Sequence, residues 1–477
     1  MKKFSALLLC VMLLLSLAPA ALAQEEVLRV YNWQDYINEG KDDDGAKIAE
    51  SVTELWEKDY EQRTGKKVRV QYDTFETNET MLNTLRTGKT SYDLVCPSDY
   101  IIQKMIAATK DGKDESISIE KFDISAMTNY NKYVSPYISD LFERSGWTDY
   151  AVAYMWGTVG FLYNPETVKY KDVSTWDFFW NTDYKNRITC KDVSRDAYVV
   201  GSLYAHSQEL KAANKKYQKG TINGEELQKI VHAAANDTSD KNIEKVGVLL
   251  SEMKNNIYGF EVDSGKTDIV SGKIDANLAW SGDAVYAMDL AEEEDGKELA
   301  FVIPEEGSTI WFDGWVMPKG ANVPLAQDFV DFLCRPEIAV MNMDYIGYTS
   351  AIAGDAIFDL VCDNYEDENG KHEYDLSYFF KGTLSEEKYV DGRVIVRTDT
   401  LGRQLTTQYP SPDEAARCGI MEDFGEKNQA VLEMWSIVKS NNISAFSYVM
   451  MAVLAVMAAL MIVSAVRRKM KKRRMRR

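Results

Sequence analysis

The chain has 477 residues, of which 45% are hydrophobic and 27% are charged, and its formal net charge is −19. Lys2, Lys3 and the nine Lys and Arg residues of 467–477 carry eleven positive charges, so the part between them has a net charge of −30. Such an acidic body disfavours nucleic acid and anionic substrates and attracts small cations, although the same charge also serves solubility. A chain of this length can bury a large core, and we expect two lobes.

Both ends of the sequence have the features of membrane targeting. Residues 1–23 combine a basic start, an apolar run and the small-x-small site Ala21-Leu22-Ala23, which predicts a signal peptide. Residues 446–466 are 21 residues without a charge, which predicts one transmembrane helix. The basic tail 467–477 follows directly, so the positive-inside tendency places it in the cytoplasm and the acidic body on the outer side of the membrane.

The first hundred residues alternate between strand and helix patterns. Strands are predicted at 27–30, 68–72 and 92–96, and helices at 48–60 and 77–85, from the period of their apolar residues. This order is typical of a parallel α/β sheet, whose strand ends carry ligands.

A second unit is predicted to begin near Tyr154-Met155-Trp156-Gly157. It includes a buried strand over 276–280, and the chain returns toward the first unit at 311–317. Residues 359–409 are acidic and rich in turns, and we interpret them as an insertion on the surface of a lobe. A final helix is expected over 426–438.

The segment Tyr31-Asn32-Trp33-Gln34-Asp35-Tyr36 places rings, an amide and a carboxylate at the end of the first predicted strand. Trp280, the pair Trp311 and Asp313, and Tyr348 repeat this chemistry later in the chain. Aromatic faces beside an acid suit an organic cation, because the rings attract cationic nitrogen and the carboxylate neutralises it. The alternative is that each ring only packs a core.

The motifs of most enzyme classes are missing. The three histidines have no partner at metal-ligand spacing, and GxSxG, phosphate-loop and GxGxxG motifs are absent. We therefore predict no catalytic residue, no metal and no cofactor, although paired carboxylates leave a glycosidase open. Five cysteines follow the signal peptide without a CxxC pair, which favours buried thiols and leaves one long-range disulfide open.

Several ordered segments together resemble a known family. The chain resembles the spermidine/putrescine-binding proteins of ABC importers, a branch of the type II periplasmic-binding-protein fold, from about Leu28 to about Ser350 and again near 423–439. The resemblance rests on residues 31–36, 75–81, 92–100, Arg195-Asp196, Ala279-Trp280-Ser281-Gly282, Trp311-Phe312-Asp313 and Ile346-Gly347-Tyr348.

The resemblance implies an α/β fold of two lobes joined by a hinge. Lobe 1 would comprise 27–152 and 311–350, and lobe 2 would comprise 153–310 and 410–440. The segment 359–409 has no clear counterpart in the family.

The resemblance also implies the ligand-binding residues. They are Trp33, Asp35, Tyr36, Ser98, Tyr100, Asp196, Trp280, Trp311, Asp313 and Tyr348. The three acids would neutralise amines while the rings sandwich the alkyl chain. Two family positions differ here, because an acid falls on Val193 and a glutamine falls on Met421. These differences leave the preference between spermidine and putrescine open.

The implied function is capture of a polyamine by lobe closure, followed by delivery to a membrane permease driven by a cytoplasmic ATPase. The family resemblance favours a monomer without a cofactor. Two alternatives stay open: a receptor or sensor for another small cationic or polar ligand, and an anchored glycosidase.

Overall fold

The computed structural model describes residues 25–41, 45–367 and 369–440. The predicted signal peptide (1–23), transmembrane helix (446–466) and basic tail (467–477) lie outside these residues. Within the described ranges, no helix is both long and apolar enough to cross a membrane.

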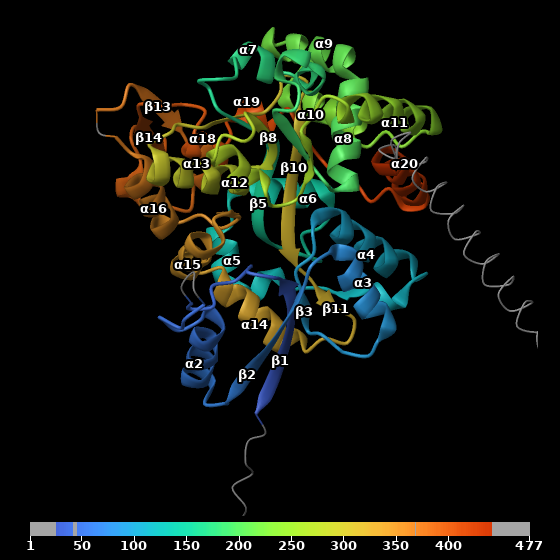
Figure 1. The fold of residues 1–477 in the computed structure, drawn as a ribbon. Helices are drawn as coiled ribbons and strands as arrows, with labels where there is room; N and C mark the ends of the chain where they lie inside the picture. The colour runs from blue at the N-terminus through green and yellow to red at the C-terminus, as the bar shows by residue number, and fades with distance from the viewer. Residues whose placement is uncertain (1–24, 42–44, 368, 441–477) are drawn as a thin grey trace, which may run out of the picture.

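A small parallel sheet forms the lower part of the molecule in Figure 1. Its strands are β2 (Val68–Phe75), β1 (Glu26–Trp33) and β3 (Leu94–Val95), paired in that order. Val30 faces Tyr72 on one side and Leu94 on the other, and its side chain is fully buried. The three predicted strands of the first unit are therefore confirmed.

A larger sheet of eight strands forms the upper part. Its main path runs β15-β10-β5-β8-β6-β7, and β9 and β12 also pair with β5. The strands are β5 (Val152–Tyr163), β6 (Ile188–Lys191), β7 (Gly259–Glu261), β8 (Ala276–Trp280), β9 (Ala300–Val302), β10 (Ser308–Trp315), β12 (Thr349–Ser350) and β15 (Cys418–Ile420). All twelve residues of β5 are buried, as expected for the central strand.

Strand β10 joins the two sheets. Its upper part pairs with β5 and β15, whereas the chain just after its lower end bonds to β3. The amide of Val316 donates to the carbonyl of Val95 at 2.9 Å, and Asp313 forms a bridge with Ser98. The end of β10 and the chain just after it therefore join the two lobes, next to the end of β3.

Helices surround both sheets (Figure 1). Those of the lower lobe are α2 (Val52–Thr64), α3 (Asn78–Thr87), α4 (Asp99–Asp111), α5 (Thr128–Tyr133), α14 (Val323–Leu333) and α15 (Pro336–Ile346). Those of the upper lobe include α8 (Ser194–Ala205), α9 (Ser207–Gln218), α10 (Gly224–Ala235), α11 (Asp240–Lys254), α12 (Gly265–Val270), α13 (Ser281–Asp295) and α20 (Asn428–Ser440). Helix α6 (Pro136–Ser145) lies near the junction.

The segment 359–409 is part of the core as well as the surface. It contains most of α16 (Asp355–Tyr365), then β13 (His372–Asp375), α17 (Ser377–Phe380), β14 (Ile395–Thr398) and α18 (Gln404–Gln408). Phe379 is fully buried and its ring stacks on Trp156 of β5 at 5.5 Å. Tyr409 packs against the same Phe379 ring at 5.1 Å. A purely superficial insertion would not fill the core in this way.

The five cysteines that follow the predicted signal peptide are all free thiols. Four are buried and Cys362 is half-buried. The long-range disulfide that the sequence left open is therefore not formed in this structure.

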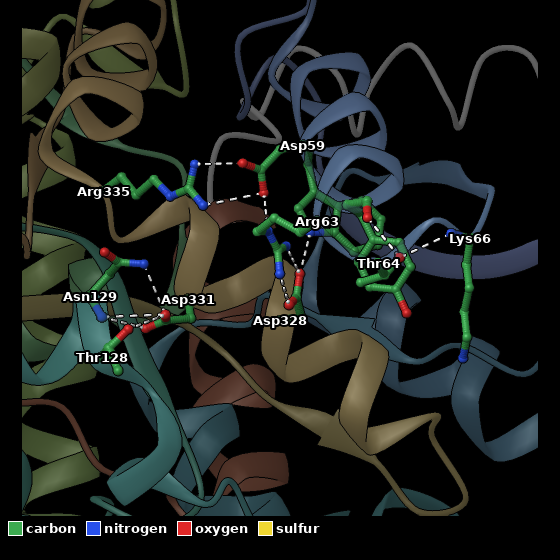
Figure 2. A network of polar contacts seen from close by, with 11 residues as sticks. Asp59, Arg63, Thr64, Lys66, Thr128, Asn129, Asp328, Asp331 and Arg335 are labelled. Carbon is green, nitrogen blue, oxygen red and sulfur yellow. Dashed lines mark hydrogen bonds and ion pairs between the residues drawn. The ribbon is translucent and has the colours of Figure 1, made fainter.

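A polar network ties α2 to α14 in the lower lobe (Figure 2). Arg63 donates to both carboxylate oxygens of Asp328, at 3.0 and 2.7 Å, and Asp59 accepts from Arg63 and Arg335. Trp56, which is fully buried, also donates its indole N–H to Asp328 at 2.9 Å. Asp328 therefore accepts hydrogen bonds from a buried indole N–H and, through both of its oxygens, from a guanidinium group.

We predict that Asp328→Ala lowers the free energy of unfolding by about 1–3 kcal/mol, because it leaves the buried Trp56 N–H without its acceptor. Urea denaturation measures the change. The matched control is Asp140→Ala, which removes an exposed pair with Arg144 and should cost less than about 0.5 kcal/mol. Equal costs for the two variants would contradict this role of Asp328.

Candidate functional site

The residues that the sequence singled out converge where the strand ends of the two sheets meet. Trp33 ends β1 and Tyr36 follows it, Ser98 and Tyr100 follow β3, and Asp196 follows β6. Trp280 ends β8, Trp311 and Asp313 lie on β10, and Tyr348 precedes β12. Ligands of α/β folds bind at such carboxyl ends.

Asp313 is the centre of this arrangement. Its carboxylate is 8% exposed and accepts a hydrogen bond from the Tyr36 hydroxyl at 2.7 Å. Burial raises the pKa of Asp313 to about 6, and hydrogen bonds from Ser98 and Tyr36 partly oppose that rise. The hydrogen-bond donors around this carboxylate are thus neutral, so its negative charge can pair with a cation from elsewhere.

Aromatic rings enclose the carboxylate. Tyr348 contacts Trp311 at 5.4 Å between ring centroids and Tyr36 edge-on at 5.9 Å. Tyr36 in turn meets Tyr154 of β5 at 5.6 Å. Ring faces beside a buried carboxylate can hold a cationic nitrogen together with its methylene groups.

Two glycines make room for these rings. A Cβ atom on Gly282 would lie 2.0 Å from Cδ1 of Tyr348, and one on Gly157 would lie 2.6 Å from Cζ2 of Trp311. Neither position has a left-handed backbone, so space and not conformation requires glycine there. Any larger residue would displace a ring of the site.

Two asparagines hold the lower side of the site. Asn78, the first residue of α3, donates to Ser98 Oγ at 3.1 Å and to the Tyr100 hydroxyl at 2.9 Å. Asn32 donates to the carbonyl of Tyr36 at 3.2 Å. Sequence reasoning did not assign these roles, although both asparagines lie in the segments that carried the resemblance.

Asp196 is the acid of the upper side. It is 5% exposed, accepts from Trp280, and its pKa is raised by burial to about 6, while Lys191 and Arg195 oppose the rise. The Arg195 guanidinium does not pair with a carboxylate. It stacks between the rings of Tyr100, at 3.9 Å, and Phe424, at 4.2 Å, and so links the two lobes.

Lys191 and Asp283 are site neighbours that the sequence analysis missed. Lys191 Nζ lies 3.2 Å from Asp283 and 4.5 Å from the centroid of the Trp280 ring. Asp283 also accepts from the Tyr348 hydroxyl at 3.1 Å. The available signal was position, because Lys191 ends strand β6 and Asp283 follows strand β8.

Asp35 is placed differently from the other predicted residues. It is exposed and has a left-handed φ of 51°, whereas Trp33 beside it packs its ring on Phe75 at 4.6 Å.

The structure also shows the environment of the two residues that differ from the family pattern. Val193 precedes α8 as its N-cap, and Met421 is buried with its carbonyl accepting from Gln103.

We predict that Asp313→Asn stabilises the ligand-free protein at pH 7 by about 1–3 kcal/mol, from the rise in pKa from 3.8 to about 6. The folded state binds the proton more tightly than the unfolded state, so ionisation above pH 6 destabilises the fold. Urea denaturation at pH 5 and pH 7 tests this: wild type should lose stability as pH rises, and the variant should lose less. Equal pH slopes would contradict the buried charge.

Comparison with known proteins agrees with this geometry. Residues 56–355 match the model of the bacterial extracellular solute-binding protein family. A spermidine/putrescine-binding periplasmic protein of Salmonella typhimurium is 28% identical over 351 residues, which cover 73% of this chain and 84% of that protein. The putrescine-binding periplasmic protein SpuD of Pseudomonas aeruginosa is 30% identical over 363 residues, covering 74% and 86%.

Solved structures show the same fold. The substrate-binding protein PotD of a Streptococcus pneumoniae spermidine/putrescine ABC transporter has a TM-score of 0.56 at 22% identity, covering 87% of this chain and 99% of that one. A putative spermidine/putrescine ABC transporter protein from Listeria monocytogenes has a TM-score of 0.56 at 24% identity, with the same coverage. The chain has the two-lobed periplasmic-binding-protein fold and belongs to the bacterial extracellular solute-binding proteins, a family of binding proteins and not of enzymes.

Proposed function

We propose that this protein captures polyamines such as spermidine or putrescine on the outer side of a membrane and delivers them to an ABC permease with a cytoplasmic ATPase. The observation that carries the proposal is the buried Asp313 carboxylate, enclosed by Tyr36, Trp311 and Tyr348 and hydrogen-bonded to neutral donors. A protonated amine with an aliphatic chain complements both the charge and the rings.

Capture by closure of the two lobes is supported by contacts that cross between them. The guanidinium of Arg195 on α8 lies on the Tyr100 ring of α4. Lys104 of α4 forms an ion pair with Asp423 at 3.0 Å, and Gln103 donates to the carbonyl of Met421. In this proposal, opening of the hinge breaks these contacts and exposes the strand ends to the ligand.

Anchoring is proposed from the sequence of the C-terminal segment. The uncharged run 446–466 and the basic tail 467–477 follow α20 closely along the chain. A membrane anchor would keep the receptor near its permease and raise its effective concentration there. We expect the protein to act as a monomer.

Calorimetric titration with putrescine and spermidine tests the ligand assignment. Asp313→Asn should weaken binding by about 3 kcal/mol, or roughly 100-fold, because the ligand ammonium loses its buried counter-charge. Asp149→Asn is the matched control, since that exposed aspartate pairs only with Lys121 on the surface and should leave affinity unchanged.

Absence of heat from either amine at millimolar concentration would refute polyamine binding. Binding of an uncharged sugar that survives Asp313→Asn would favour the alternative receptor for a small polar ligand. Gene neighbours that encode a permease and an ATPase would favour a transport component over a sensor.

Polyamine affinity should fall as the pH is lowered from 7.5 to 5. Asp196 and Asp313 each have a pKa of about 6 in the ligand-free protein, so a bound ammonium must displace a proton below that pH. One pH unit below the pKa, each carboxyl reduces the affinity by up to about tenfold. Titrations across this range measure the slope, which should be shallower in Asp313→Asn. A pH-independent affinity would contradict the role of both carboxyls.

A further inference from the structure

Lys191 is a lysine buried inside the upper lobe. Its side chain is 1% exposed, and its ammonium meets three acceptors: the carbonyl of Val262 at 2.7 Å, Asp283 at 3.2 Å and Glu261 at 3.4 Å. The ammonium donates hydrogen bonds to the Val262 carbonyl and to Asp283, and Glu261 adds an ion pair. A buried lysine with two carboxylates is held as a cation in a fixed place.

This cation lies at the proposed ligand site. Its nitrogen is 4.5 Å from the centroid of the Trp280 ring, which also donates to Asp196. Asp283 connects Lys191 to the hydroxyl of Tyr348, whose ring contacts Trp311. Lys191 thus contacts an aromatic face and a carboxylate, which are the two kinds of group that bind an amine nitrogen of a ligand.

Of the three predicted ligand acids Asp35 is exposed, so two buried carboxylates remain for a ligand. None of the ion pairs between described residues involves Asp196 or Asp313, although both are buried beside the rings. Asp283 and Glu261 pair with Lys191, and Lys266 lies 3.5 Å from Asp283, so two cations balance these two carboxylates. Asp99 is fully buried and accepts from the amide of Tyr100 at 2.6 Å, and burial raises its pKa well above the usual value.

We propose that Lys191 is a tethered ammonium group that takes the place of one ligand nitrogen, so that the site selects an aliphatic diamine over a triamine. Two free carboxylates pair with two ammonium groups, and a third would find the carboxylates at the Trp280 end already paired with Lys191. This inference rests on the proposed polyamine function and deepens it by naming the ligand class.

The test compares putrescine, a diamine, with spermidine, a triamine, by calorimetry at pH 7.5. Wild type should bind putrescine at least tenfold more tightly than spermidine. In Lys191→Met, Asp283 and Glu261 become available to a third ammonium, so the affinity ratio should move toward spermidine by at least threefold. Tighter binding of spermidine by wild type, or a smaller movement of the ratio in Lys191→Met, would overturn the inference.

The triple variant Lys191→Met/Glu261→Gln/Asp283→Asn removes the lysine together with both of its carboxylate partners and keeps side chains of similar size. It leaves no buried charge of this group unpaired, so it provides a second test if the single variant does not fold. Because it offers no carboxylate to a third ammonium, its affinity ratio should stay within threefold of wild type. A larger shift toward spermidine would show that the freed carboxylates are not the cause and would overturn the inference.

The outcomes also separate this inference from the proposed function. If wild type binds neither amine, the polyamine proposal itself fails. If it binds both amines and the ratio does not respond to Lys191→Met, the polyamine proposal survives and only the role of Lys191 is refuted.

Discussion

The buried negative charge of Asp313 is the constraint on which the rest of the site depends. A carboxylate that is 8% exposed has lost most of its hydration, and the donors that replace water here, Tyr36 and Ser98, are neutral. Burial of an uncompensated charge costs free energy, so this carboxylate lowers the stability of the folded state. In the proposed function, a cationic ligand pairs with this carboxylate and is bound more tightly because the charge has no partner in the protein.

Parts of the chain that are distant in sequence come together to place this carboxylate and its neighbours. Strand β10 passes from the larger sheet to the smaller one, and it brings Trp311 and Asp313 to the level where β1 and β3 end. Asn78 and Gly282 then set the positions of neighbouring side chains by hydrogen bonding and by leaving space. The contact of Arg195 with Tyr100 crosses between the lobes.

Periodicity predicted the strands of the first unit well, because β1 and β2 are regular and bury apolar residues in register. The recurrence of rings beside acids singled out Tyr36, Trp311, Asp313 and Tyr348, which lie together in the structure. Sequence could not show that Asp35 faces solvent, since its left-handed backbone is set by the turn after β1. Nor could it reveal the contact of Lys191 with Asp283, which are 92 residues apart, or the stacking of Phe379 on Trp156.

The most direct measurement is a crystal structure of the protein with a bound polyamine. The account predicts an ammonium nitrogen within hydrogen-bond distance of the Asp313 carboxylate, with the aliphatic chain against the rings of Trp311 and Tyr36. A polyamine bound elsewhere, with the Asp313 carboxylate still contacted only by Tyr36 and Ser98, would contradict it.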